Sequence, residues 1–561
     1  MLTGYLTPLG IKINEKKLLD RLGDRAKLNK LLKALTVKEK PLPGRPRTYN
    51  TRTAYRRMDN SIYVPKAKAE TFLKNKIINE IKQSKNYSIP ISRIIEDEKW
   101  EIARSFYDYQ VIAAEYIVEN YYHKLHQSRN VAYIHMDTGV GKTCFSIAVS
   151  SMLKGPTFVV APTDKLRNDW ITEFKTVFPN LIVNAYKNLP KNLSVKSKKI
   201  EFNSTNSDIV VGVINTVCKK DVGFFEGYRL VIIDEAHELY SPTKMDLLWL
   251  LQEADNVLML SATPDSAIHG LDKIVYHFAG NPIYAAKDIP GINIDKSIFM
   301  GRVREINYHG HPDHCEVVLS EAGTINSMGT IGNLLKDPYR LQLIVHEIKQ
   351  IYNSHNTLSP DLMLEMGIGP RPLNVASDKF PEIRTHSIFV FAELRSYLIV
   401  LRDELFKSFS ADEIDIPELT DTDESISNTD ESISESTEIG VLRGGASAKD
   451  CELAKHARIV LTTYGYSRRG VSLTNMTTLI LASPRRNGLH QIVGRITRSG
   501  SDQSIIRQVI DIKDMCSPLK NQNSERRKVY KDRKYPIYMV EYDYEGDLKD
   551  IPGIGAEKKV K

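Results

Sequence analysis

The sequence predicts an α/β fold in which two tandem parallel-sheet units, each with helices on both faces, follow a basic N-terminal accessory domain. From position 106 onward, short apolar runs alternate with amphipathic stretches, as in parallel strands that helices cover on both faces. The alternation pauses near 280–290 and then resumes, which indicates a second unit of the same kind. At 561 residues, the chain has room for about three to four domains.

Each element is predicted from this alternation. In the first unit, apolar runs predict strands at 131–134, 157–161, 208–214, 230–234 and 257–260. Amphipathic stretches predict helices at 144–154 and 164–178. In the second unit, strands are expected at 387–391, 458–463 and 478–483. We therefore expect an accessory domain over 1–97, one α/β domain over 98–285, a second over 286–515 and a C-terminal tail over 516–561.

The N-terminal region is distinctly basic. Residues 1–100 contain 23 Lys and Arg against 10 Asp and Glu, whereas the whole chain carries a net charge of only +8. Such a surplus suits a polyanion, because neutralised phosphates release condensed counterions. A solubilising arm or an assembly surface would have the same composition. Residues 1–47 have a basic helical pattern that ends at the Pro/Gly-rich stretch PLPGRPR, and SIYVP further on is strand-like.

Composition excludes several classes of protein. No apolar run approaches the ~20 residues of a membrane-spanning helix, so no membrane association is expected. The N-terminus has no signal-peptide pattern. The five cysteines lie far apart without a CxxC pair, which argues against a zinc site and favours a reducing, cytoplasmic location.

Two stretches interrupt the second unit. Residues 353–380 have the composition of a long surface loop. Residues 411–440 contain 11 acidic residues and no Lys or Arg, with TDESISN followed directly by TDESISE. Such a segment cannot bury enough apolar surface to become ordered, so we expect a disordered acidic insertion. The acidic insertion could be a regulatory tether or a tolerated expansion of a loop, and loop expansions are the more common of the two.

A phosphate-binding loop is predicted between the first strand and the helix that follows it. Gly139 and Gly141 permit the required backbone angles, and the backbone N–H groups form an anion nest at the positive end of the helix. The Lys142 ammonium would reach the β- and γ-phosphates of ATP, and the Thr143 hydroxyl would bind Mg²⁺. Met136 stands where the simplest pattern has its first glycine. The loop comprises Met136, Asp137, Thr138, Gly139, Val140, Gly141, Lys142 and Thr143.

A second motif carries the acid groups. The buried strand at 230–233 leads into Asp234 and Glu235, and two carboxylates at the end of such a strand are costly unless they serve a metal and a water. Asp234 would hold Mg²⁺, and Glu235 would polarise the attacking water. A solvated acidic turn is the alternative, and the phosphate loop upstream disfavours it.

These motifs together resemble those of superfamily 2 helicases. The phosphate loop, DEAH at 234–237, SAT at 261–263 and QIVGRITR at 491–498 occur in the family's order and spacing, and the resemblance covers roughly 100–510. It implies two RecA-like domains, with ATP bound between them and nucleic acid across both.

The resemblance also implies individual roles. Arg495 and Arg498 would stabilise charge on the transferring phosphoryl group, and Gln491 would position the water or the γ-phosphate. Gln110 would read the adenine edge, and Gly470 belongs to a segment that touches both ATP and the nucleic-acid backbone. Residues that would couple hydrolysis to domain closure are His237, Ser261 and Thr263. Residues that would contact nucleic acid are Pro162, Thr163, Asn215, Thr216 and Thr463.

A narrower resemblance links the chain to phage branch-migration helicases and to the helicases of large cytoplasmic DNA viruses, including poxvirus transcript-release and African swine fever virus types. The resemblance to the phage helicases rests on the segment TTYGYSRRGVSLTNMTTLILASPRRN, which precedes QIVGRITR. The resemblance to the viral helicases rests on ALTVKEKPLPG together with SIYVPK. These resemblances imply that the protein acts on DNA or RNA together with transcription or replication machinery. An ATP-gated nucleic-acid binding factor that does not separate strands is the alternative.

Overall fold

In the computed structural model, the chain forms two compact units, Met1–Ile294 and Asp295–Lys561. The surface loop expected at 353–380 and the acidic insertion expected at 411–440 lie almost wholly outside the described residues. The described residues are 2–39, 50–84, 93–122, 130–137, 139–186, 207–264, 270–292, 301–321, 323–353, 386–410, 438–444, 453–454, 456–467, 476–485, 488–497, 505–515, 519–542 and 558–560.

The N-terminal part of unit 1 is a mixed β-sheet with helices packed on it, in the order β5-β6-β2-β1-β7. The prediction of helix over 1–47 is therefore wrong for the first fourteen residues, which form an antiparallel hairpin. Each strand of the hairpin has only five residues, and a longer basic helical pattern follows it. This pattern hides the alternation that buries Ile11 and Ile13 in the second strand. The elements are β1 Thr3–Thr7, β2 Gly10–Asn14, α1 Glu15–Leu22, α2 Arg25–Ala34, β3 Thr36–Lys38, β4 Thr51–Thr53, β5 Arg56–Met58, β6 Ser61–Val64, α3 Ala69–Lys74 and β7 Glu80–Gln83.

This N-terminal part is joined to the rest of unit 1 by side-chain packing and polar bonds. Its buried residues belong to the same apolar cluster as one face of the neighbouring sheet. The Lys66 backbone N–H donates to Gln252 Oε1 at 2.8 Å. The Arg56 guanidinium lies 4.7 Å from the centre of the Trp249 ring and 3.2 Å from the Asp246 carboxylate. The two parts therefore stabilise each other.

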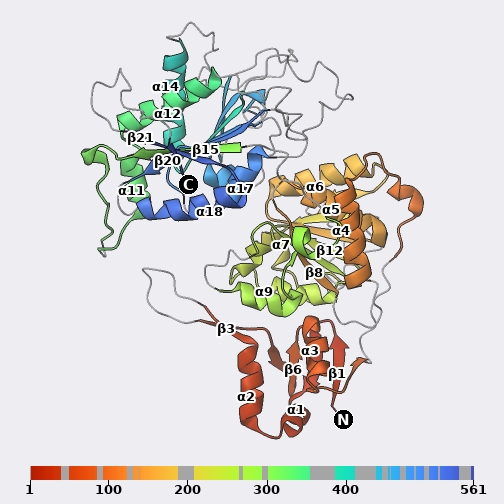
Figure 1. The fold of residues 1–561 in the computed structure, drawn as a ribbon. Helices are drawn as coiled ribbons and strands as arrows, with labels where there is room; N and C mark the ends of the chain where they lie inside the picture. The colour runs from red at the N-terminus through yellow and green to blue at the C-terminus, as the bar shows by residue number, and fades with distance from the viewer. Residues whose placement is uncertain are drawn as a thin grey trace, which may run out of the picture. The chain divides into compact units, whose positions relative to one another are not determined.

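The main sheet of unit 1 has seven parallel strands in the order β10-β11-β9-β12-β13-β8-β14, and all five predicted strands lie in it. Helices α4, α5 and α6 pack on one face, and α7 and α9 pack on the other (Figure 1). Helix α8 belongs to the same apolar cluster as α7 and α9. The elements are α4 Asp108–Ile117, β8 Val131–His135, α5 Lys142–Leu153, β9 Thr157–Ala161, α6 Asp164–Val177, β10 Val183–Ala185, β11 Ile209–Val213, α7 Ile214–Val217, β12 Leu230–Ile233, the 3₁₀ turn η6 Ala236–Tyr240, α8 Leu247–Leu250, β13 Val257–Ser261, α9 Asp272–Ala279, β14 Ile283–Tyr284 and α10 Ala285–Asp288.

Unit 2 contains a second parallel sheet, in the order β17-β18-β16-β19-β20-β15-β21-β22, in which only β22 is antiparallel. Helices α11, α12 and α14 pack on one face, and α17 and α18 pack on the other. The predicted α/β fold class with two parallel sheets is thus confirmed. The elements are β15 Gly301–Tyr308, α11 Ser327–Leu334, α12 Pro338–Tyr352, β16 Ile388–Ala392, α14 Arg395–Ser410, β17 Ile439–Leu442, β18 Ile459–Thr463, α16 Tyr464–Ser467, β19 Thr478–Leu481, α17 Leu489–Val493, the 3₁₀ turn η11 Gly494–Ile496, β20 Arg507–Asp514, α18 Asn523–Asp532, β21 Ile537–Tyr542 and β22 Lys558–Lys559.

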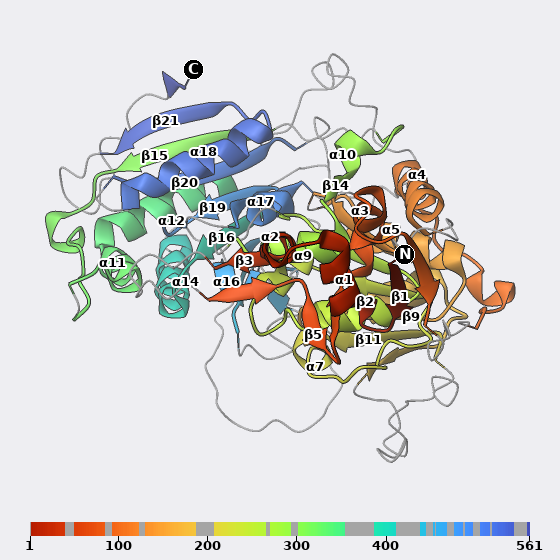
Figure 2. The ribbon, with the colours of Figure 1, turned by 90° about the horizontal axis from the view of Figure 1, so that it is seen from below.

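Residues 516–561, expected as a C-terminal tail, contribute α18 and β21 to this unit. Strand β21 pairs with β15 along its whole length, and α18 lies along the same strands (Figure 2). Arg527 of α18 donates to the buried Glu305 carboxylate at 2.8 and 2.9 Å, and the Tyr530 hydroxyl donates to Asp511 at 2.7 Å. A partly exposed arginine bonded to a buried carboxylate and a buried tyrosine–aspartate hydrogen bond therefore hold this segment on the sheet.

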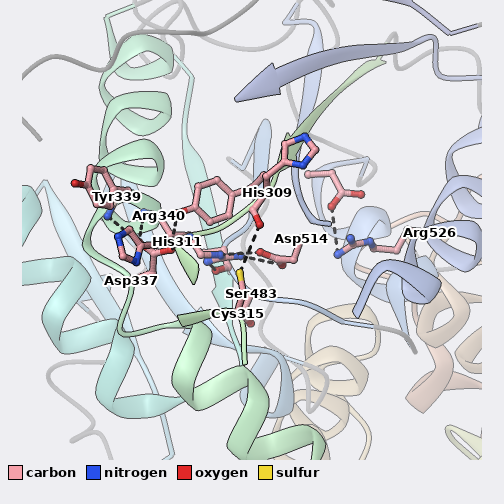
Figure 3. Close-up of polar contacts among 12 residues, drawn as sticks. His309, His311, Cys315, Asp337, Tyr339, Arg340, Ser483, Asp514 and Arg526 are labelled. Atoms are coloured by element: carbon pink, nitrogen blue, oxygen red, sulfur yellow. Dashed lines mark hydrogen bonds and ion pairs between the residues drawn. The ribbon is translucent and has the colours of Figure 1, made fainter. Parts of the chain in front are cut away.

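The carboxyl edge of this sheet is fixed by a buried ion pair. The Arg340 guanidinium, which is fully buried, donates to Asp514 at 2.9 and 3.2 Å (Figure 3). Asp337 begins α12 by accepting the N–H groups of its first turn, and it also accepts the Tyr308 hydroxyl at 2.5 Å. These bonds anchor the ends of β15 and β20 and the start of α12.

Candidate active site

Three predicted motifs of unit 1 meet at one edge of its sheet. Strands β12, β13 and β8 are neighbours, and their register pairs Ile233 with Met259 and Leu260 with Ile134. Because all three strands are parallel, their carboxyl ends open onto the same edge, where parallel sheets bind ligands. The acidic pair, the SAT segment and the phosphate loop follow these ends directly.

The phosphate loop has the backbone that its sequence predicts. Gly139 and Gly141 adopt φ angles of +88° and +77°, and Gly141 directly precedes α5. A Cβ atom added to Gly141 would lie 2.2 Å from Gln110 Nε2, so the position also requires glycine for space. The Lys142 ammonium lies 3.6 Å from Glu235 Oε1. Thr143 is partly buried in the first turn of α5, and Thr138 lies outside the described residues.

Met136, which replaces the first glycine of the simplest pattern, belongs to the apolar core under the loop. Its side chain is buried among α4, α5 and the sheet, and its N–H donates to the Ser261 carbonyl at 3.3 Å. The methionine therefore serves as an apolar support for the loop, which leads on through Asp137 to Gly139 and Val140.

The acidic pair, Asp234 and Glu235, is held in place by polar contacts with neighbouring groups. Asp234 accepts the Trp170 indole N–H at 3.0 Å and the Glu235 N–H at 2.9 Å. Burial raises the pKa of the Asp234 carboxyl, and the Glu235 charge raises it further, whereas Lys142 opposes both effects. Glu235 adopts φ = +49°, a strained value for a non-glycine residue. The role of the Trp170 indole could not be predicted, since no sequence pattern relates it to Asp234.

The predicted coupling residues form a chain of polar contacts. His237 Nδ1 lies 3.2 Å from Glu235 Oε2 and 3.2 Å from Ser261 Oγ. Ser261 Oγ, which is fully buried, also accepts the Thr263 N–H at 3.0 Å. The structure thus brings His237, Ser261 and Thr263 into one connected group beside the acidic pair.

The predicted nucleic-acid residues of unit 1 lie on two neighbouring strand ends. Pro162 and Thr163 follow β9, Asn215 and Thr216 follow β11, and the register pairs Ala161 with Val213. Asn215 and Thr216 are exposed on α7, whereas the Thr163 hydroxyl caps α6 by accepting the Leu166 N–H at 3.3 Å.

The predicted residues of unit 2 are partly described. Gln491 is buried in α17, and its Oε1 has no hydrogen-bond partner among the described residues. Arg495 lies in the turn η11, directly after α17. Thr463 ends β18, and its hydroxyl accepts the Tyr466 N–H at 3.2 Å. Gly470 and Arg498 lie outside the described residues.

Metal-ligand groups and membrane-spanning helices are both absent from the described part of the chain. Across these ranges, no three His, Cys, Asp or Glu side chains are grouped as metal ligands. None of the helices there is both long enough and apolar enough to cross a membrane.

Comparison with known proteins gives the family. The model of the type III restriction enzyme res subunit matches residues 104–266, which contain the phosphate loop, DEAH and SAT. The helicase QP509L of African swine fever virus (strain Badajoz 1971 Vero-adapted) is 35% identical over 539 residues, which cover 96% of this chain and 92% of that protein. The Saccharomyces cerevisiae helicase FUN30 is 30% identical over 155 residues, 26% of this chain and 14% of FUN30.

Two solved structures are also similar. T4 UvsW has a TM-score of 0.32 at 12% identity and covers 96% of this chain and 99% of UvsW. S. cerevisiae Dbp5 bound to RNA and ADP BeF3 has a TM-score of 0.43 at 12% identity and covers 74% of this chain and 87% of Dbp5. The identity to QP509L over nearly the whole of both chains shows that this protein belongs to the superfamily 2 helicases, which are ATP-dependent enzymes that act on nucleic acid.

Proposed function

We propose that ATP is hydrolysed at the phosphate loop of unit 1 and that this hydrolysis moves the protein along a nucleic-acid strand and separates the duplex ahead of it. The observation that carries the proposal is the convergence of Lys142 and Glu235, whose charged atoms lie 3.6 Å apart at the carboxyl edge of the sheet. A cation that can bind phosphate and a carboxylate that can orient water thus lie next to each other. In-line phosphoryl transfer requires both groups beside the phosphate that is transferred.

Each group has a chemical task. The N–H groups of the loop and the Lys142 ammonium bind the β- and γ-phosphates. Glu235 orients the attacking water, and His237 with Ser261 transmits the state of Glu235 to the SAT segment. In unit 2, Gln491, Arg495 and Arg498 act on the γ-phosphate, where an arginine in other phosphate-loop enzymes is worth ~10³–10⁵ in rate. Gly470 belongs to the segment assigned to ATP and the nucleic-acid backbone.

Mg²⁺ fits the donors that are present. Asp234 and Thr143 offer carboxylate and hydroxyl oxygens, which Mg²⁺ prefers, and Mg²⁺ commonly uses only one or two protein ligands beside substrate phosphates and water. The raised pKa of Asp234 is consistent with a site that a cation would complete. When bound, Mg²⁺ would neutralise charge on the phosphates.

We propose that nucleic acid is gripped by its phosphates at Pro162, Thr163, Asn215 and Thr216 of unit 1 and at Thr463 of unit 2, with little sequence preference. The name of the QP509L relative refers to RNA. This supports an RNA-related task such as transcript release, with transcription machinery as the partner. DNA replication or repair in the cytoplasm is the alternative.

Substitutions at the two convergent groups test the site. Lys142→Ala removes the loop cation, so turnover should be lost, and Glu235→Gln should still bind ATP but fail to hydrolyse it. Steady-state ATPase and nucleotide binding on purified protein measure both effects. Hydrolysis at a near-normal rate in either variant would refute the assignment.

A further inference from the structure

We propose that Arg533, directly after helix α18, and Arg507 of strand β20 are positioning residues that hold the turn carrying Arg495 in the conformation that serves hydrolysis. Arg495 belongs to the QIVGRITR motif, whereas both supporting arginines follow the motif in the chain. The C-terminal segment that contains α18 is thereby a working part of the ATPase. The inference rests on the proposed function, because it requires that Arg495 acts on the γ-phosphate.

The turn that carries Arg495 is short and is buried on both sides of that residue. Helix α17 ends at Val493, and the turn η11 covers only the next three residues. Gly494 and Ile496 are buried, whereas Arg495 between them is partly exposed. The backbone position of Arg495 therefore depends on the groups that hold its two neighbours.

Two guanidinium groups bond to the end of this turn. Arg507 Nε donates to the Ile496 carbonyl at 2.5 Å, and the Arg507 side chain is fully buried. Arg533 Nη1 donates to the Thr497 hydroxyl oxygen at 3.1 Å. Arg533 Nη2 also lies 3.5 Å from the His490 carbonyl, but this carbonyl already accepts a backbone N–H at the end of α17, so the contact adds little. The bonds to Ile496 and Thr497 are thus the ones that fix the turn.

Arg533 is itself held by the packing of the segment around it. Its backbone N–H donates to the Val529 carbonyl of α18 at 3.3 Å. The buried Tyr535 ring packs so closely on Gly301, at the start of β15, that an added Cβ atom would lie 2.3 Å from it. Apolar residues of α17, η11, α18 and β21 belong to one cluster, and α17 lies beside α18 (Figure 1). The Arg533 guanidinium therefore contacts the turn from a rigid support.

The position of the turn matters because a charge stabilises phosphoryl transfer only where charge develops in the transition state. A displacement of about 1 Å can cost ~10²-fold in rate. Loss of the bond at Thr497 frees one end of a three-residue turn, so Arg495 can move by such a distance. The effect should fall on turnover and spare ADP binding, because the phosphate loop belongs to unit 1.

Arg533→Ala tests the inference, and Arg533 is only partly buried, so the variant should fold. It should lower kcat by about 10-fold or more. The affinity for ADP should stay at the wild-type value. The affinity for ADP with aluminium fluoride, a mimic of the phosphoryl group in transfer, should fall by the same factor as kcat. Lys531→Ala removes an exposed charge from the last turn of the same helix and is the matched control, with wild-type values expected.

A double-mutant cycle isolates the bond itself. Thr497→Val keeps the shape of the side chain and removes the oxygen that accepts from Arg533. Alone, it should cause a loss similar to that of Arg533→Ala, and the double variant should lose no more than either single variant. Arg533→Lys keeps a positively charged donor and should restore part of the rate.

Arg495→Ala separates this inference from the proposed function. Wild-type turnover in Arg533→Ala and Thr497→Val, beside a large loss in Arg495→Ala, would overturn the inference and leave the proposed function intact. Equal losses of kcat and of ADP affinity in Arg533→Ala, or losses that add in the double variant, would also overturn it. Wild-type turnover in Arg495→Ala would overturn the role of that arginine in the proposed function and the inference with it.

Discussion

Single residues decide whether the phosphate loop can form, and Gly141 is the clearest case. Its φ of +77° disfavours any L side chain, and an added Cβ would also lie 2.2 Å from Gln110 Nε2. Gly23 offers a matched comparison, because its φ of +74° is nearly the same but no atom lies within 4 Å of an added Cβ. The two positions therefore separate backbone strain from steric conflict.

Gly141→Ala should reduce kcat/KM for ATP by at least about 10-fold, because the loop must move away from Gln110 as well as bear a strain of about 1–2 kcal/mol. Gly23→Ala should bear only the strain, with a slightly lower thermal midpoint and unchanged ATPase. Equal ATPase rates in the two variants would show that the contact with Gln110 has no role.

Among the secondary-structure elements, the longer apolar strands can be predicted from sequence, whereas strands that contain buried charges cannot. Strands β8, β9, β11, β12 and β13 were predicted because their residues are continuously apolar. Strand β15 was missed because Arg304 and Glu305 interrupt its apolar pattern, and β20 was missed because Asp511 does the same. Glu305 and Asp511 are buried against partners from other elements, such as Glu305 with Arg527, and sequence periodicity cannot show such pairs.

The residues of the candidate site also divide into those that sequence patterns can identify and those that they cannot. Lys142, Asp234, Glu235 and their spacing were recognisable because motif chemistry is local in sequence. The bond from Trp170 to Asp234 and the bonds from Tyr109 and Gln110 to the loop depend on how helices pack on the sheet. Local patterns do not encode such contacts between elements.

A buried histidine joins three strands of unit 2 and makes its stability depend on pH. His386 Nε2 accepts from Gln508 at 3.2 Å, so Nδ1 carries the proton and donates to the Thr477 or Thr478 hydroxyl, both at 3.0 Å. Burial, with smaller contributions from the positive charges of Arg507, Arg458 and Arg302, lowers the pKa of His386 to about 4. The folded protein therefore keeps this ring neutral below the ordinary histidine pKa of 6.5.

Unit 2 should lose stability as the pH falls from 6.5 toward 4, because only the unfolded chain then takes up this proton. The loss should approach about 3 kcal/mol, at 1.36 kcal/mol for each unit of pKa difference. His386→Asn should flatten that part of the profile, and His456→Asn, at an exposed histidine, should not. Thermal midpoints across this pH range measure the difference, and parallel profiles for wild type and His386→Asn would contradict the assignment.

At the scale of the whole molecule, the basic N-terminal part is built into unit 1. Removal of residues 1–97 would uncover the surface that Arg56 and Lys66 cover near Trp249 and Gln252. A truncated chain would therefore lose stability as well as charge. Surface substitutions test the charge alone.

Helix α2 presents exposed lysines at 27, 30 and 33. If each contacts a phosphate, replacement of all three by glutamine should weaken nucleic-acid binding and lower the slope of log affinity against log salt by about 2–3, at ~0.7–0.9 for each phosphate. The matching Lys→Arg triple keeps the charge and should keep the slope. A glutamine triple with the wild-type slope would assign this surface to another partner.

Hydrolysis at Lys142 and Glu235 is proposed to drive strand separation, and strand displacement measured beside ATPase on one preparation tests this coupling. The wild-type protein should displace a labelled strand from a tailed duplex only while it hydrolyses ATP. Glu235→Gln should bind both ATP and the duplex and displace nothing. Wild-type protein that hydrolyses ATP on nucleic acid without displacing any strand, or Glu235→Gln protein that displaces the strand at the wild-type rate, would show that hydrolysis does not drive strand separation.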